Sequence, residues 1–167
     1  YVDDAHGEGV LGEKGAGIGV HYNVHDKLDV EMGTFSKAFG VVGGLAAGSQ
    51  DLYNFAFNKS RSWLLSGSHP PAVAGAQLAA IQVLDEEPQH WENLWKNTNY
   101  FKKRIQSMGF DTGNTETPII PVMLGEAATA WSFSKRLFEE KIFATAIAFP
   151  TVPRGKARIR VMMTAAH

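Results

Sequence analysis

The sequence contains no cysteine and no excess of charge of one sign. The absence of cysteine excludes disulfide bonds and thiolate metal sites. Sixteen basic residues balance 17 acidic ones, for a formal net charge of -1, which argues against a nucleic-acid partner or a polybasic membrane contact. No apolar run approaches the ~20 residues of a membrane span, and no basic-then-apolar leader opens the chain. We therefore expect a cytoplasmic protein without nucleic-acid or membrane partners.

The 167 residues suffice for one domain with a sizeable core, or for one domain and part of another. Residues 1–87 are rich in glycine and alternate short apolar runs with loops, whereas residues 88–167 alternate helical and strand patterns. This texture predicts an α/β protein with a domain boundary near residue 87. The chain begins at "YVDDAH", within an expected strand, and stops at "MMTAAH" without a closing helix, so we expect a fragment.

Apolar periodicity and end signals predict the individual elements. Ser49 is the expected N-cap of one helix, and the alanine-rich helix that opens on proline is apolar on most faces, so we expect it to be largely buried. The expected strands are 27–36, 43–49, 118–124, 142–148 and 156–163, and the expected helices are 49–58, 70–87, 91–109 and 126–141.

A lysine in an unusual setting raises the functional question. In "EMGTFSKAFGVVGG", Lys37 lies among glycines, small hydroxyl residues and apolar residues, with no acidic residue nearer than Glu31. Surface lysines usually have polar neighbours. Desolvation lowers the pKa of a lysine and makes its amine nucleophilic toward carbonyl groups.

Two further polar segments could meet this lysine. Asp3 and His6, in "VDDAHGEG", follow an expected strand, and open α/β sheets bind ligands at the carboxyl ends of strands. Ser66 and Ser68, in "LLSGSHPP", precede an expected helix, where anions bind well. A carboxylate, an amine and phosphate donors are the parts that a pyridoxal-phosphate (PLP) enzyme needs.

Three motifs then carry a family resemblance: "VDDAHGEGVLG", "GTFSKAFGVVGG" and "PTVPRGKARIRVMMTAAH". They closely resemble the α-oxoamine synthases, PLP-dependent transferases of fold type I. The resemblance covers essentially the whole chain. It implies part of the large-domain sheet plus a small C-terminal α/β domain, and a homodimer with shared active sites. "TPIIPVMLGEA" looks most like the glycine C-acetyltransferases, which condense glycine with acetyl-CoA; the 8-amino-7-oxononanoate synthases, which use alanine and pimeloyl-CoA or its carrier-protein thioester, are the close alternative.

The resemblance also implies a role for each candidate residue. Lys37 matches the Schiff-base lysine, and Asp3 matches the aspartate that pairs with the pyridinium nitrogen. His6 matches the histidine near the cofactor's phenolic oxygen and the reacting carbonyl. Thr34 matches a phosphate ligand. Ser66 matches a phosphate contact from the neighbouring subunit, although Ser68 stays open, and Ser66 could equally cap the following helix.

Strand alternation gives one check on the arginines. In "KARIRVMM", Ile159, Val161 and Met163 share one face, whereas Arg158 and Arg160 share the other. A guanidinium binds a carboxylate as a fork that lysine cannot reproduce. The resemblance implies that Arg160 holds the carboxylate of the amino-acid substrate.

Several plainer readings compete with these roles. Asp4 is interpreted as structural, bonding backbone or solvent, and His69 as part of a local turn. A metal hydrolase using Asp3, Asp4 and His6 is one alternative class, although no repeated His/Asp spacing accompanies them. A non-catalytic scaffold is another, against which the intact Asp3, His6 and Lys37 set argues.

Overall fold

The computed structural model describes residues 1–167 and divides into two compact units, Tyr1–Trp91 and Glu92–His167. A division into domains at residue 87 stays a prediction, and the boundary between the units falls inside a helix. The elements are β1 (Val2–Asp3), η1 (Glu13–Gly15), α1 (Ile18–His21), η2 (His25–Lys27), β2 (Val30–Thr34), β3 (Gly44–Gly48), α2 (Gln50–Lys59), α3 (Arg61–Leu64), α4 (Pro71–Glu86), α5 (Gln89–Ser107), β4 (Ile119–Gly125), α6 (Ala127–Glu139), β5 (Thr145–Ile147) and β6 (Ala157–Met162).

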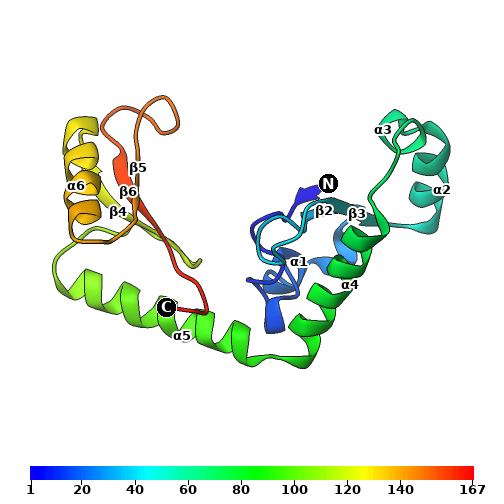
Figure 1. Ribbon diagram of the computed structural model, residues 1–167, viewed down its shortest axis with the longest axis horizontal. Helices are drawn as coiled ribbons and strands as arrows, with labels where there is room; N and C mark the ends of the chain where they lie inside the picture. The colour runs from blue at the N-terminus through cyan, green and yellow to red at the C-terminus, as the bar shows by residue number, and fades with distance from the viewer. The chain divides into compact units, whose positions relative to one another are not determined.

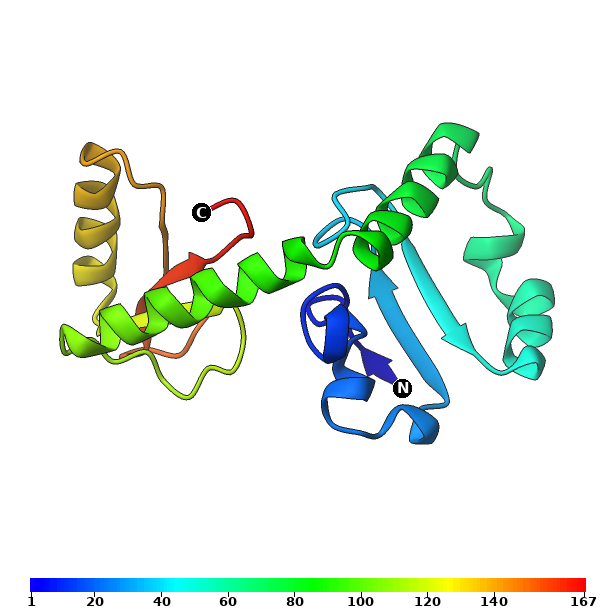
Figure 2. The ribbon, with the colours of Figure 1, turned by 90° about the horizontal axis from the view of Figure 1, so that it is seen from below.

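The sheet of the first unit has the order β1-β2-β3. The central strand β2 runs parallel to β1 and antiparallel to β3, and the opposed arrows of β2 and β3 are visible in Figure 2. Asp3 pairs with Met32, and Gly44 pairs with Thr34. The strands expected within residues 27–36 and 43–49 are confirmed, and the loops after β1 and β2 both leave the same edge of this sheet.

The helix ends follow the local signals in the sequence. Ser49 caps α2 as predicted, because its Oγ accepts a hydrogen bond of 3.2 Å from the amide of Leu52. Proline occupies the first turn of α4, where its missing amide proton costs nothing. Helix α5 ends as expected just before Gly109, which adopts a left-handed φ of 85°.

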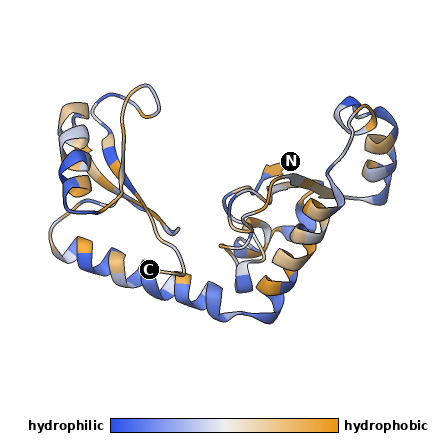
Figure 3. Ribbon diagram, viewed as in Figure 1, coloured by the Kyte–Doolittle hydropathy of each residue, from blue (hydrophilic) through white to orange (hydrophobic).

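The expectation that the alanine-rich helix is largely buried is wrong. Helix α4 contains no buried residue, and Leu78 is 70% exposed. Figure 3 shows apolar colouring along this helix. A helix that is apolar on most faces needs neighbours on several sides, whereas α4 packs within its unit chiefly beside η1 and reaches the loop before β3 through Gln77. None of the helices is both long and apolar enough to traverse a bilayer.

The second unit is built on an antiparallel sheet in the order β4-β6-β5, and α6 packs on it (Figure 1). The predicted alternation along the last strand is confirmed in its first part, because Ile159 is buried while Arg158 and Arg160 are only half-buried. Val161 is half-buried and packs against the core, and Met163 is half-buried as well. Ile159 lies opposite Val122 of β4 and Ala146 of β5, and these residues form the core together with Ala130 of α6.

Shortening Ile159 tests this core. Ile159 is 1% exposed, so Ile159→Ala leaves a cavity and should lower the free energy of unfolding by about 2–5 kcal/mol. Met162→Ala is the matched control, because Met162 lies on the same strand but is 57% exposed. Urea denaturation of the full-length protein measures both. Equal losses for the two variants would contradict the assigned core.

Candidate functional site

The predicted aspartate lies where β1 ends. Asp3 is the last residue of β1, and its Oδ1 accepts a hydrogen bond of 3.0 Å from the amide of Ala5, which fixes the carboxylate at the sheet edge. The other oxygen of this exposed carboxylate has no hydrogen-bond partner within the chain. His6 follows in the next turn and is also exposed. Both side chains are therefore open to a ligand at this edge.

Asp4 organises the glycine-rich segment that follows. It is 2% exposed, its carbonyl accepts the amides of Gly7 and Glu8, and its Oδ2 accepts the amide of Ile18 at 2.8 Å. Gly17 has a left-handed φ of 98°, and a β-carbon there would collide with the Asp4 carboxylate. The interpretation of Asp4 as a structural residue that bonds backbone is confirmed.

Burial has an electrostatic consequence for this carboxyl group. Desolvation raises the pKa of Asp4 above its ordinary value of 3.8, and hydrogen bonding with the backbone of Ile18 and Gly7 and with the side chain of Glu31 opposes the rise without cancelling it. Asp3 adds a smaller repulsive contribution in the same direction as burial. Ionised Asp4 therefore carries a cost in the folded protein.

A second carboxylate of this segment reaches the neighbouring strand. Glu8 Oε2 accepts the amide of Thr34, the last residue of β2, at 3.0 Å. Burial raises the pKa of Glu8, and the charges of Asp4, Glu31 and Asp3 raise it further, against the lowering effect of the Thr34 amide. Sequence reasoning did not single out Glu8. Its position between two glycines marks the segment as unusual, but nothing in the local spacing indicates that its partner is Thr34.

Lys37 lies in a short closed loop between β2 and β3. The amide of Phe35 donates to the carbonyl of Gly43 at 3.0 Å, and the amide of Val41 donates to the carbonyl of Phe35 at 2.7 Å. The hydroxyl of Thr34 also donates to the Gly43 carbonyl, at 3.1 Å, and lies 2.8 Å from Ser36 Oγ. The two ends of the loop are thus bonded together.

The side chain of Lys37 itself is exposed, and its ammonium forms no hydrogen bond or ion pair within the chain. The apolar setting expected from the sequence is therefore not present around the amine. Of the apolar neighbours in its segment, only Phe35 is buried, where it packs on Phe39 at 5.3 Å between ring centroids. The loop turns its aromatic residues inward and leaves the amine outside.

The serines before α4 do not cap that helix. Its N-cap is Pro70, with no side-chain hydrogen bond, so the reading of Ser66 as a helix cap is wrong. Ser66 Oγ instead accepts the amide of Ser68 at 3.1 Å, and Ser68 has a left-handed φ of 62°. The N-cap position falls on Pro70, four residues after Ser66 and two after Ser68, so neither hydroxyl occupies it. Both serines are exposed.

Two residues beyond this turn approach the closed loop, and the sequence did not indicate that they would. A β-carbon at Gly43 would lie 2.5 Å from Gln77 Nε2 and 2.8 Å from His69 Cε1. Gln77 Nε2 donates to the carbonyl of Val42 at 2.9 Å. His69, interpreted as a turn residue, thus also packs against the loop that carries Lys37, and a side chain at position 43 would obstruct it.

Arg160 lies on the central strand β6 of the second unit, opposite Pro121 and Thr145. Its Nε is buried and has no hydrogen-bond partner. An unsatisfied buried donor costs about 1–3 kcal/mol, and an acceptor such as a carboxylate would remove that cost. The neighbouring Arg158 satisfies its own Nε through the carbonyl of Lys156 at 2.9 Å.

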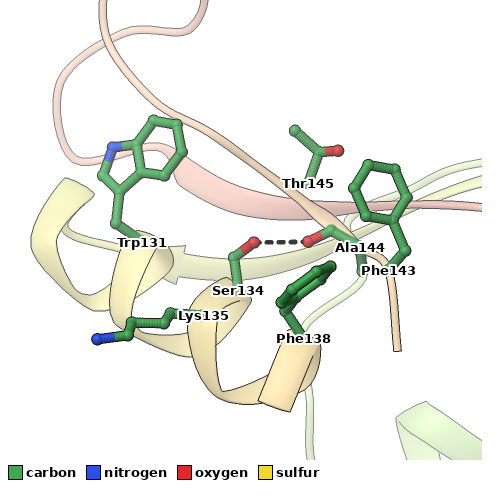
Figure 4. A pocket seen from close by; sticks show the side chains of 7 residues that line it. All are labelled: Trp131, Ser134, Lys135, Phe138, Phe143, Ala144 and Thr145. Atoms are coloured by element: carbon green, nitrogen blue, oxygen red, sulfur yellow. Dashed lines mark hydrogen bonds between the residues drawn. The ribbon is translucent and has the colours of Figure 1, made fainter. Parts of the chain in front are cut away.

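Two other features lie apart from these residues. No group of three or more His, Asp and Glu side chains is arranged to hold a metal ion, so the metal-hydrolase alternative gains no support from the geometry. An open apolar groove of about 360 Å³ lies on the second unit (Figure 4), and none of the predicted site residues lines it. Its lining residues are Trp131, Ser134, Lys135, Phe138, Phe143, Ala144 and Thr145.

Comparison with known families decides the relationship. The model of the family described as aminotransferase class I and II matches residues 1–167. The chain belongs to this family. Among curated aminotransferase-family relatives, the 8-amino-7-oxononanoate synthase of Symbiobacterium thermophilum is 52% identical over 167 residues, which are 100% of this chain and 43% of that protein. A Thermus thermophilus protein named 8-amino-7-oxononanoate synthase/2-amino-3-ketobutyrate coenzyme A ligase is 53% identical, over 100% of this chain and 42% of its own length.

Solved structures agree with the family assignment. Serine palmitoyltransferase from Sphingomonas wittichii superposes with a TM-score of 0.92 at 31% identity, covering 99% of this chain and 42% of that one. A structure of SPT with PLP gives a TM-score of 0.92 at 27% identity, with the same coverage. The α/β fold is thus that of part of a fold-type-I transferase, as predicted, and the chain spans about 42% of the length of these proteins.

The raised pKa of the buried Asp4 predicts how the free energy of unfolding depends on pH. Because its pKa is raised in the folded state, its contribution to stability is complete below pH 3.8, its ordinary pKa, and is lost as pH rises through the raised value. Asp4→Asn cannot ionise but keeps an oxygen for the Ile18 amide, so its unfolding free energy should fall less over this window. Urea denaturation of the full-length protein at a series of pH values measures the slopes. Asp26→Asn, at an exposed position, should keep the wild-type slope, and an Asp4→Asn slope equal to wild type would contradict the assignment.

Proposed function

We propose that these residues are part of a PLP-dependent α-oxoamine synthase, which joins an amino acid to the acyl group of a thioester. The observation that carries the proposal is the parallel pairing of β1 with β2. It brings the carboxylate of Asp3 and the loop of Lys37 to one sheet edge, each with its ionic group open. The family membership and the names of the relatives support the same class of reaction.

The residues fit the cofactor by their chemistry. The free oxygen of Asp3 suits a protonated pyridine nitrogen, and the unpaired amino group of Lys37, in its deprotonated form, suits an aldehyde. Thr34, with the Ser36 hydroxyl 2.8 Å away, is proposed as a phosphate ligand, for which its hydroxyl would turn its hydrogen from the Gly43 carbonyl to the phosphate. Ser66 is proposed as a further phosphate ligand. When bound, PLP supplies an electron-withdrawing ring that stabilises negative charge at the α-carbon of an amino acid.

The remaining chemistry belongs to side chains of this chain. With the cofactor bound, Lys37 as the free amine would take the proton from the α-carbon of the amino acid, and the negative charge of Asp3 would keep the ring nitrogen protonated. His6 donates a hydrogen bond to the oxygen on which charge develops when the acyl thioester is attacked. Arg160 binds the substrate carboxylate, for which its unsatisfied Nε is the supporting observation.

The names of the similar relatives change which reaction of the family we favour. The sequence motifs placed glycine C-acetyltransferase first, but several similar relatives are named 8-amino-7-oxononanoate synthase, and the Thermus thermophilus protein carries both names. We therefore favour condensation of alanine with pimeloyl-CoA or its carrier-protein thioester, releasing CoA or the carrier together with carbon dioxide. Condensation of glycine with acetyl-CoA is the second candidate.

Product analysis of the full-length enzyme tests this choice. With PLP, alanine plus pimeloyl-CoA should give 8-amino-7-oxononanoate. The kcat/KM of this reaction should exceed the kcat/KM for glycine plus acetyl-CoA. Lys37→Ala should lower the rate at least about a thousandfold, because it removes the proposed base, whereas Lys27→Ala, at an exposed site in η2, should not. Faster formation of 2-amino-3-oxobutanoate would restore the first-ranked member, and no product with either pair would contradict the class.

The proposed assembly is a homodimer whose sites take Ser66 from the partner subunit, with an equivalent contact at each of the two sites. The resemblance supports this sharing. Because both serines are exposed and neither caps α4, they are available for such a role.

Subunit mixing tests the shared site. A Lys37→Ala subunit and a subunit with Ser66→Ala and Ser68→Ala should each be nearly inactive alone. In a mixed dimer one site collects both defects, whereas the other receives an intact lysine and intact serines, so activity should return toward half per dimer. If subunit exchange is demonstrated and activity does not return, the serines are local turn residues.

A further inference from the structure

Glu8 supplies the hydrogen-bond acceptor for β2 that a further residue of β1 would supply if that strand continued. The ladder between β1 and β2 ends with the amide of Asp4 donating to the carbonyl of Met32 at 2.7 Å. In a parallel ladder, the next donor of β2 on this side is the amide of Thr34. Beyond Asp3 the first strand has turned away, because the Asp4 carbonyl accepts the amides of Gly7 and Glu8. The carboxylate of Glu8 accepts the Thr34 amide instead, at 3.0 Å.

The carboxylate of Glu8 fits only because residue 33 is a glycine. Gly33, the residue before Thr34, is buried, and a β-carbon there would collide with both oxygens and the carboxyl carbon of Glu8. Glu8 therefore lies directly across the backbone of residue 33. Any other residue at this position would displace the carboxylate and leave the Thr34 amide without its acceptor.

The surroundings of Glu8 disfavour its ionised form, although it is this carboxylate that accepts the Thr34 amide. Burial and the charges of Asp4, Glu31 and Asp3 raise the pKa of Glu8. Besides these carboxyl groups, His25 is near, 3.6 Å from Glu31, but Glu8 has no basic partner of its own. A carboxylate kept in such surroundings for one backbone amide indicates that the position of that amide matters.

The residue that Glu8 holds is the proposed phosphate ligand. The amide of Thr34 is bound by Glu8, while its hydroxyl is bound to Gly43 and lies beside Ser36. Thr34 is therefore restrained on both its backbone and its side chain, three residues before Lys37. We infer that Glu8 is a positioning residue, which fixes the end of β2 so that the Thr34 hydroxyl and the Lys37 loop stand in the geometry for cofactor binding. This inference rests on the proposed function.

Three variants distinguish a positioning role of the Glu8 oxygen from an effect of its negative charge. Glu8→Ala removes the acceptor and the charge, whereas Glu8→Gln removes the charge and keeps an oxygen for the Thr34 amide. Glu13→Ala is the matched control, at an exposed glutamate in η1, five residues after Glu8. In the full-length protein, Glu8→Ala should weaken PLP binding about tenfold, the upper range for the loss of one ordinary hydrogen bond, and should speed deuterium exchange in the peptide that holds Thr34. Glu8→Gln and Glu13→Ala should stay within about twofold of wild type.

The outcomes distinguish the claims. If Glu8→Ala binds PLP and exchanges like wild type, the inference is overturned while the proposed function stands. If Glu8→Gln loses as much as Glu8→Ala while both keep the wild-type melting temperature, charge rather than position acts, and the inference is again overturned. If the wild-type protein itself binds no PLP, the proposed function fails. Should Glu8→Ala not fold, Gly33→Ala is measured in its place, because it displaces the same carboxylate.

Discussion

The parallel pairing of β1 with β2 is the constraint on which the first unit depends. Only two residue pairs define it, Val2 with Glu31 and Asp3 with Met32. Parallel strands end at one edge, so this short ladder brings the segments of Asp3, His6 and Lys37 together although they are far apart in the chain. The polar residues around it serve the same geometry, because Asp4 holds the loop that leaves β1 and Glu8 continues the ladder after β1 has turned away.

The sequence was sufficient where a residue's role is local. Ser49 had to cap a helix because its oxygen meets an amide three residues on, and Ile159 had to be buried because alternate strand residues share a face. The Asp3, His6 and Lys37 set was recognisable because its residues fall in motifs of a known family. Such features require no knowledge of which distant segments meet.

The sequence was insufficient where a role depends on a distant partner. Glu8 matters through the amide of Thr34, and His69 through its packing on Gly43, and neither pairing leaves a trace in local spacing. The prediction that α4 is largely buried was wrong for a related reason. Composition shows that a helix can be covered on every side, but not which neighbours cover it, and in this structure Leu78 is exposed. Ser66 failed as a cap because the helix begins at Pro71 with Pro70 in the N-cap position, four residues after Ser66.

The closed loop around Lys37 has a consequence for the free energy of binding. A nine-residue flexible segment would have to be ordered whenever a ligand engaged its lysine, at a cost in conformational entropy that grows with the number of residues restrained. Here Phe35, Val41 and Gly43 bond the two ends of the loop together, and Gln77 of α4 donates to the carbonyl of Val42 at one of these ends. Part of that entropy is therefore lost on folding, and a ligand that engages the lysine has fewer residues left to order.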